Sequence, residues 1–146
     1  MTATDNATSI GVMTPDKKTI FVTKTQGSNV YGLRIIQLNG QTFSPSDMVG
    51  TWRSHGLASS SSSAIWMYDL SYINSAGDQT HVASINSMGN TTPSAEIQAL
   101  TLGPTGTITE SGNQDMHGQA SFNKDVAIAT KTRDGGFYAL NIILKQ

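Results

Sequence analysis

Three histidines, His55, His81 and His117, are the residues of this chain best suited to acid–base chemistry. Histidine and carboxylate side chains can act as general acids or bases, and the candidates for that role are His55, Asp69 and His117. His55 and His117 each precede a glycine near a strand end, so the two rings could meet in space. No two histidines have His-x-His or His-x-x-x-His spacing and no carboxylates cluster beside them, so we expect no bound metal.

The sequence contains no established catalytic motif around these residues. Residues 59–63 are five consecutive serines. A serine nucleophile needs a neighbouring base, so a flexible loop explains this run better. Gly-x-Ser-x-Gly, phosphate-loop and paired-carboxylate patterns do not occur. We therefore expect no catalytic constellation and no cofactor.

Residues 64–73, AIWMYDLSYI, alternate as a strand with one aromatic face. Trp66, Tyr68, Leu70 and Tyr72 share that face, and Ile65, Met67, Asp69, Ser71 and Ile73 share the other. The aromatic face either lines a ligand cavity or fills the core, and the sequence leaves both alternatives open. If it binds a ligand, that ligand is a small apolar molecule or a carbohydrate. The candidate binding residues are Trp66, Tyr68, Tyr72, His55 and His117.

Short β-rich segments separated by turn residues make up most of the chain, and helical periodicity is absent beyond a turn or two. We expect strands at 19–25, 30–38, 51–57, 64–73, 79–86, 95–102, 106–110, 116–122, 125–132 and 136–144. The one helical candidate is residues 44–49, where a serine N-cap precedes a proline. Evenly spaced short strands with tight turns predict an all-β, antiparallel fold.

One segment of the sequence occurs twice. Residues 11–39 align without a gap to residues 118–146, at an offset of 107 residues, and nine of the 29 pairs are identical. Random pairing would give roughly two, and strand propensity does not explain a gapless register. We interpret residues 40–146 as one complete unit of a tandem repeat. Residues 1–39 are then the C-terminal hairpin of a preceding unit, with residues 1–9 expected to be disordered.

The composition excludes several kinds of partner. The 146 residues carry nine basic and ten acidic side chains without a cluster of either sign, so we expect neither nucleic-acid binding nor an electrostatic membrane anchor. No apolar run approaches the roughly 18 residues that span a bilayer, so we expect no membrane insertion. Cysteine is absent, which excludes disulfides and thiol catalysis.

The location of the protein follows less directly from composition. The polar but uncharged surface is common in secreted bacterial β-proteins, so we expect an extracellular or cell-surface protein. Residues 1–9 have neither the basic nor the apolar region of a signal peptide. An export signal would then belong to a longer precursor.

Residues 46–52, SDMVGTW, join a short helical turn to a Gly-x-Trp strand start. This segment resembles the opening of the calycin barrels, the lipocalins and avidin-like proteins, and residues 46–146 also resemble tandem calycin-like repeats of bacterial secreted proteins. The resemblance implies an antiparallel up-and-down β-barrel of about eight strands, with Trp52 closing one end, besides the N-terminal β-hairpin. Only two tryptophans are present, so the tryptophan cage with which avidins enclose biotin is missing.

For this barrel we expect a core of nine apolar residues: Trp52, Leu57, Trp66, Leu70, Leu100, Ile108, Ile128, Leu140 and Ile142. The hairpin in residues 19–38 has unpaired edges, so we expect it to form homo-oligomers. Two functions remain open. The first is a non-catalytic binding or structural repeat module, which the repeat favours. The alternative is a small β-barrel enzyme of the isomerase or cyclase type, with His55, Asp69 or His117 as acid or base.

Overall fold

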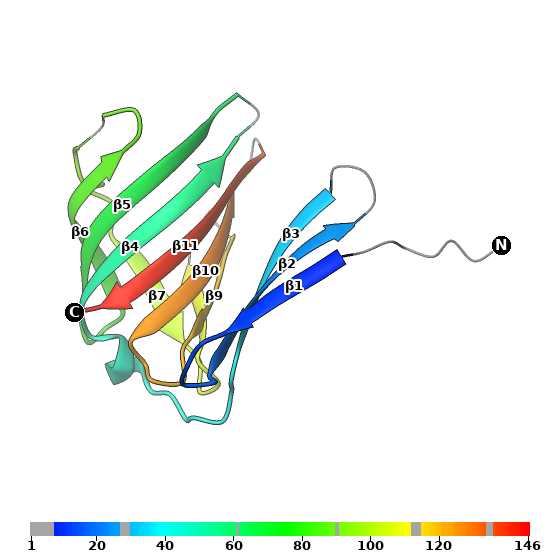
Figure 1. Cartoon of the computed structure of the whole chain (residues 1–146). Coiled ribbons are helices and arrows are strands. Elements are labelled where there is room, and N and C mark those ends of the chain that lie inside the picture. The colour runs from blue at the N-terminus through cyan, green and yellow to red at the C-terminus, as the bar shows by residue number, and fades with distance from the viewer. Residues whose placement is uncertain (1–7, 27–29, 61, 90, 112–114, 134–135) are drawn as a thin grey trace. The chain divides into compact units, whose positions relative to one another are not determined.

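The computed structural model of the chain describes residues 8–26, 30–60, 62–89, 91–111, 115–133 and 136–146. The chain divides into two compact units, residues 1–39 and residues 40–146. Figure 1 shows both units. Among the described residues, no helix has the length and apolar character needed to cross a membrane.

The second unit is a closed antiparallel barrel of eight strands. They are β4 (Gly50–Ser59), β5 (Ala64–Ile73), β6 (Asp78–Asn86), β7 (Gln98–Leu102), β8 (Thr107–Ser111), β9 (Asp115–Ala120), β10 (Val126–Arg133) and β11 (Phe137–Lys145). Each strand pairs with the next along the chain, and β11 returns to pair with β4 (Figure 1). The all-β class and the eight-stranded antiparallel barrel predicted from the sequence are therefore confirmed.

The pairing around the barrel is uneven. The long strands β4 and β5 pair over ten residues each, from Gly50–Ile73 to Ser59–Ala64. In contrast, β6 and β7 pair only at Asp78–Ala99 and Gln79–Gln98. The wall between β6 and β7 is thus the least hydrogen-bonded part of the barrel.

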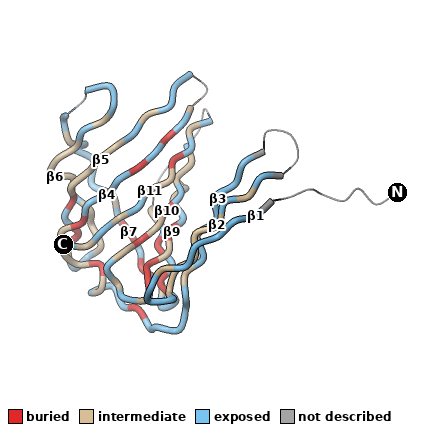
Figure 2. Tube along the Cα trace, in the orientation of Figure 1, coloured by how far each residue is buried: buried red, intermediate tan, exposed pale blue. Residues whose placement is uncertain are grey.

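Small residues line much of the barrel interior. Ala58 on β4, Ala127 and Ala129 on β10 and Ala139 on β11 are all buried. The larger core residues gather near one end of the barrel, and Figure 2 marks buried positions in red. This cluster consists of Phe43, Met48, Trp52, Ile73, Leu100, Leu102, Ile108, Ala120 and Ala127.

Only three of the nine expected core residues are buried, namely Trp52, Leu100 and Ile108. The prediction was wrong for the other six, whose strand positions alternate with the inward ones: Leu57, Trp66, Leu70, Ile128, Leu140 and Ile142. Trp52 and Leu57 are five residues apart on one strand, so they cannot share a face. The pairing of Leu57 with Trp66 and Leu140 then carries the same outward orientation to the neighbouring strands.

A short 3-10 helix, η1 (Pro45–Met48), closes the barrel end near Trp52. The indole Nε1 of Trp52 donates a hydrogen bond to the carbonyl of Met48 at 2.7 Å. Lys124, in the turn between β9 and β10, donates to Asp47 at 2.9 Å, and Lys145 donates to the Asp47 carbonyl at 2.7 Å. The helical turn expected at residues 44–49 and the burial of Trp52 are both confirmed.

The Asp47 carboxylate gives this barrel end a pH dependence. The hydrogen bond from Lys124, and secondly that from the Ser44 backbone amide, hold the pKa of Asp47 below its ordinary value of 3.8. A carboxyl whose folded-state pKa is lowered stabilises the fold above its unfolded pKa and loses that contribution as the pH falls through the folded value. We expect residues 40–146 to lose stability below about pH 4.

Thermal unfolding between pH 3 and 7 measures this effect, and Asp47→Asn should flatten part of the profile. Asp16 is a matched control, because hydrogen bonds from Thr14 and the Lys18 amide also lower its pKa but it lies in the first unit. Asp16→Asn should leave the acid-induced unfolding of the barrel unchanged. An identical profile for Asp47→Asn and the unmodified protein would contradict the role assigned to Asp47.

The first unit is a three-stranded antiparallel sheet of β1 (Thr8–Met13), β2 (Thr19–Gln26) and β3 (Val30–Gln37). The expected hairpin is β2–β3, and the prediction missed β1. Disorder was expected for residues 1–9. Residues 1–7 lie outside the described residues, but Thr8 and Ser9 begin β1, so the expectation was wrong for these two. β1 pairs with β2 over six residues. The backbone hydrogen bonds of this pairing hold β1 as a strand although its own sequence has a weak strand signal.

The sheet of the first unit repeats the last three strands of the barrel at the offset of 107 residues. β1 and β2 begin and end at the residues equivalent to the ends of β9 and β10. The registers also agree, since Phe21 pairs with Ile35 as Ile128 pairs with Ile142. Lys17 and Lys124 both adopt the left-handed conformation, with φ of 60° and 64°. The two sheets thus share their backbone pattern in detail.

Candidate functional site

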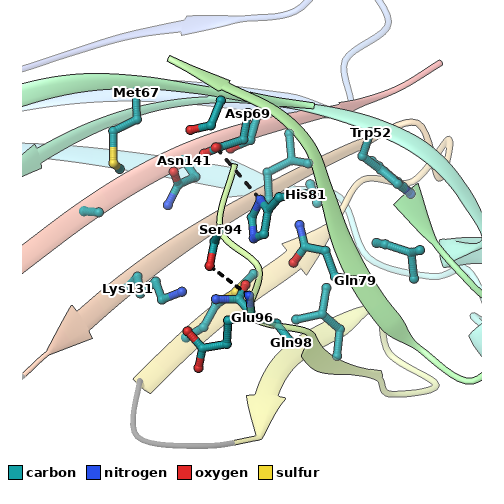
Figure 3. A pocket seen from close by; sticks show the side chains of 18 of the residues that line it. Trp52, Met67, Asp69, Gln79, His81, Ser94, Glu96, Gln98, Lys131 and Asn141 are labelled. Carbon is teal, nitrogen blue, oxygen red and sulfur yellow. Dashed lines mark hydrogen bonds and ion pairs between the residues drawn. The ribbon is translucent and has the colours of Figure 1, made fainter. Parts of the chain in front are cut away.

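The barrel interior contains a cavity of about 460 Å³. Figure 3 shows the side chains around it, which come from strands on all sides of the barrel and from the segment between β6 and β7. Pockets for small molecules usually measure about 300–1,000 Å³. The cavity is therefore large enough for a small organic molecule.

The end of the cavity near η1 is apolar. Met48 on η1, Trp52 on β4 and Ile73 on β5 form part of this lining. Leu100, Ile108 and Ile143 add to it from β7, β8 and β11, and the amides of Gln79 and Gln98 also line the cavity beside Ile73. An apolar group bound here would be removed from water, which favours binding by roughly 25 cal/mol for each Å² of apolar surface.

The middle of the cavity carries an acid–base pair. Asp69 on β5 and His81 on β6 both line it, with Nδ1 of His81 3.9 Å from a carboxylate oxygen of Asp69 (Figure 3). That distance permits an ion pair when the histidine is protonated but is too long for a hydrogen bond. Nδ1 of His81 is buried and has no hydrogen-bond partner among the described residues. A bound polar group could satisfy it.

A second charged pair lies deeper in the wall. Lys131 on β10 lines the cavity, and its Nζ lies 3.1 Å from a carboxylate oxygen of Glu110 on β8. The Glu110 side chain is only 4% exposed and that of Lys131 is 16% exposed. This oxygen of Glu110 has no partner with hydrogen-bond geometry among the described residues. Charge pairing with Lys131 is thus what offsets its burial.

One wall of the cavity is formed by irregular chain. Because β6 and β7 pair only near the η1 end, the remainder of β6 is not hydrogen-bonded to β7. There, Thr92, Ser94 and Glu96 line the cavity (Figure 3). The amide of Glu96 donates to the Ser94 hydroxyl at 3.2 Å, a contact within the segment itself. Among the described residues, this wall is therefore held by fewer strand pairs than any other part of the barrel.

The five candidate ligand-binding residues predicted from the sequence are absent from the cavity lining: Trp66, Tyr68, Tyr72, His55 and His117. The expectation that the aromatic face lines a cavity or fills the core is corrected, because Trp66 and Tyr72 are exposed on the outside of the barrel. The face opposite to it, with Ile65, Met67 and Asp69, lines the cavity instead.

The two histidines expected to meet are separated. His55 on β4 and His117 on β9 are exposed and have strands β11 and β10 between them. Neighbouring strands lie about 4.8 Å apart, so three strand spacings separate the rings by roughly 14 Å. His55 instead packs edge-to-face on Tyr68, with ring centroids 5.1 Å apart.

Sequence reasoning missed His81, Lys131 and Glu110 as cavity residues. Of the proposed acids and bases, only Asp69 lines the cavity. The signal for Lys131 was present, since the repeat retains a lysine at the equivalent position, Lys24. No three His, Asp or Glu side chains of the described residues gather closely enough to hold a metal ion.

Comparison with known proteins adds little to this description. No protein-family model matches the chain, and no curated protein matches its sequence. One structural match is the crystal structure of a protein of unknown function from the DUF3598 family, from Nostoc punctiforme. It covers 94% of this chain and 86% of that protein, with 8% sequence identity and a TM-score of 0.38. A likeness of this degree carries no functional information.

Proposed function

We propose that residues 40–146 form a non-catalytic module that binds a small amphipathic molecule inside the barrel. The cavity of about 460 Å³ is the observation that carries the proposal. Its apolar end suits a hydrocarbon or ring, while Asp69, His81 and Lys131 suit a polar group. The Gly-Thr-Trp start of β4 and the eight-stranded up-and-down barrel support assignment to calycin-like barrels, which hold ligands inside.

The repeat supports a second part of the proposal, that the module is one of several along a secreted or cell-surface bacterial protein. The sheet of residues 8–37 has the strand bounds, registers and left-handed lysine of strands β9–β11. Lys124 pairs with Asp47 on η1, whereas Lys17 forms no ion pair with another described residue. This difference is expected if the partner of Lys17 belonged to a preceding unit. Several binding units on one chain raise avidity.

The matched variants Ser54→Phe and Ser59→Phe test the cavity as the binding site. Ser54 lines the cavity, whereas Ser59 is exposed on the same strand. Titration with the fluorescent probe 8-anilinonaphthalene-1-sulfonate, followed by competition with medium-chain fatty acids and small glycosides, measures binding. We expect Ser54→Phe to weaken binding at least tenfold and Ser59→Phe to leave it unchanged, with the same circular dichroism. Equal binding by all three proteins would contradict the proposal.

The small-barrel enzyme is the second candidate, and the Asp69–His81 pair inside the cavity is the observation that favours it. His55 and His117 lie outside the cavity, so this alternative now relies on Asp69 with His81. Turnover of a bound ligand, abolished by both Asp69→Asn and His81→Gln while binding persists, would support it over simple binding.

A further inference from the structure

The outside of the barrel carries a broad apolar face over strands β10, β11, β4 and β5. We call it the outer face, and its residues are Val126, Ile128, Tyr138, Leu140, Ile142, Leu144, Leu57, Trp66, Tyr68, Leu70 and Tyr72. The strand registers align them in rows: Leu140, Leu57 and Trp66 are cross-strand neighbours. Leu57 is 67% exposed and Tyr138 is 61% exposed. Exposed apolar patches of this kind usually mark interaction surfaces.

The size and charge of the outer face suit a protein partner. Four strands about 4.8 Å apart, with about eight residues at 3.3 Å each, cover on the order of 500 Å² in projection. Because four of the eight strands of a closed barrel span half of its curved wall, one contact engages only part of this face. It is therefore smaller than the roughly 800 Å² that each partner buries in a standard interface, and falls among the weak interfaces. The outward positions of β10 and β11 carry no charged residue, whereas those of β4 include Arg53, which is exposed beside Leu144 and Leu70. Depletion of charge and enrichment in aromatic residues are typical of interface centres.

The first unit carries the same residues at the strand positions equivalent to those of the outer face. Five of the nine identities between the two copies fall at outward positions: Thr23/Thr130, Thr25/Thr132, Tyr31/Tyr138, Leu33/Leu140 and Ile35/Ile142. Tyr31 is 76% exposed and Leu33 is 52% exposed. By contrast, Ala127 and Ala129, which are buried inside the barrel, correspond to Ile20 and Val22. The two copies thus share residues at exposed positions, where packing inside a barrel does not require identity, and differ at these buried positions.

We propose that the outer face binds the same face of a second copy of the chain, in a sheet-on-sheet contact. Of the described outward positions on these four strands, only Arg53 carries a fixed charge, so two copies of the face meet mainly through apolar and aromatic contact, and a face that binds itself gives a two-fold symmetric dimer. The retention of this face in both units is explained if each contacts an equivalent unit of the other chain. Trp66, Tyr68 and Tyr72 then act at an interface between chains and are not ligand contacts.

Sedimentation velocity of the full chain at several concentrations, with lysines placed in the face, tests this proposal. Tyr138→Lys with Ile142→Lys changes the second unit, and Tyr31→Lys with Leu33→Lys changes the first. The control is Val82→Lys with Ile97→Lys, since these residues are 57% and 65% exposed but lie outside the outer face. Far-UV circular dichroism and cooperative thermal unfolding show that each variant remains folded.

We expect the unmodified protein and the control to associate at micromolar concentration. Each face pair should weaken association at least tenfold, and the four lysines together should give a monomer. A protein that is monomeric up to about 100 μM before any substitution would overturn the proposal. Association that survives all four lysines would also overturn it, and would favour pairing through the edges of β1 and β3 instead.

Discussion

Trp52→Ala is expected to destabilise residues 40–146 by about 3–5 kcal/mol, the range for large-to-small changes of buried aromatic residues. Trp52 is 4% exposed and packs in the core cluster beside Met48 and Ile73. The substitution also leaves the Met48 carbonyl without the indole donor that holds η1 on the barrel end. Urea unfolding followed by far-UV circular dichroism measures the loss without relying on tryptophan fluorescence.

The chain offers a matched control, because its other tryptophan, Trp66, is 47% exposed on the outer face. Trp66→Ala removes the same side chain from a different environment, and we expect a loss of about 1 kcal/mol or less at a concentration where the chain is monomeric. Similar losses for the two variants would show that Trp52 does not have the central packing role described above.

Lys131→Met is expected to cost about 3–5 kcal/mol, as breaking one side of a buried ion pair does. The substitution leaves the Glu110 carboxylate, 4% exposed, without a compensating charge. Replacing both partners, in Lys131→Met with Glu110→Leu, removes the uncompensated charge and should recover most of the loss. Chemical unfolding of the two single variants and the double variant gives the coupling between them.

Lys24→Met is the matched control for this cycle, since Lys24 is the repeat equivalent of Lys131. It lies in the first unit and forms no ion pair with another described residue. We expect it to leave the unfolding of the barrel unchanged. A loss below about 1 kcal/mol for Lys131→Met, or no recovery in the double variant, would argue that the pair is hydrated and contributes little.

The positions of all strands except β1 were predictable from the sequence, because turn residues and β-rich runs mark them locally. The direction in which each strand faces was not predictable in the same way. Alternation reveals two faces but not which is inside, and here strands β4, β10 and β11 place alanines inside the barrel while larger apolar residues of the same strands face outward. The prediction placed the bulkier face of β5 either in the core or in a ligand cavity, so Trp66 and Tyr72 were assigned to the inside of the barrel instead of the outside.

The pairing of Asp69 with His81 in the cavity was not predictable for a second reason. Asp69 lies opposite Ser84, and simple alternation from Ser84 would place Val82 inside and His81 outside. A register shift between Leu70 and Ser71 instead brings His81 opposite Ser71. This irregularity turns His81 into the cavity and leaves Val82 exposed. A β-bulge of this kind gives one strand an extra residue relative to its partner. It depends on how two strands pair, so the sequence of either strand alone gives no reliable signal for it.

The buried alanines of β10 also bear on which of two similar sheets closes the barrel. Strands β4–β8 need three more strands to close, and the chain carries two sheets with the same strand pattern, one on each side of them. If the N-terminal sheet closed the barrel, Ile20 would replace Ala127, which lines the cavity, and Val22 would replace the fully buried Ala129. The first change would take up part of the cavity, and the second would overpack its surroundings at a cost of roughly 1–3 kcal/mol. Side-chain volume at these two positions therefore favours closure of strands β4–β8 by β9–β11 over closure by the N-terminal sheet.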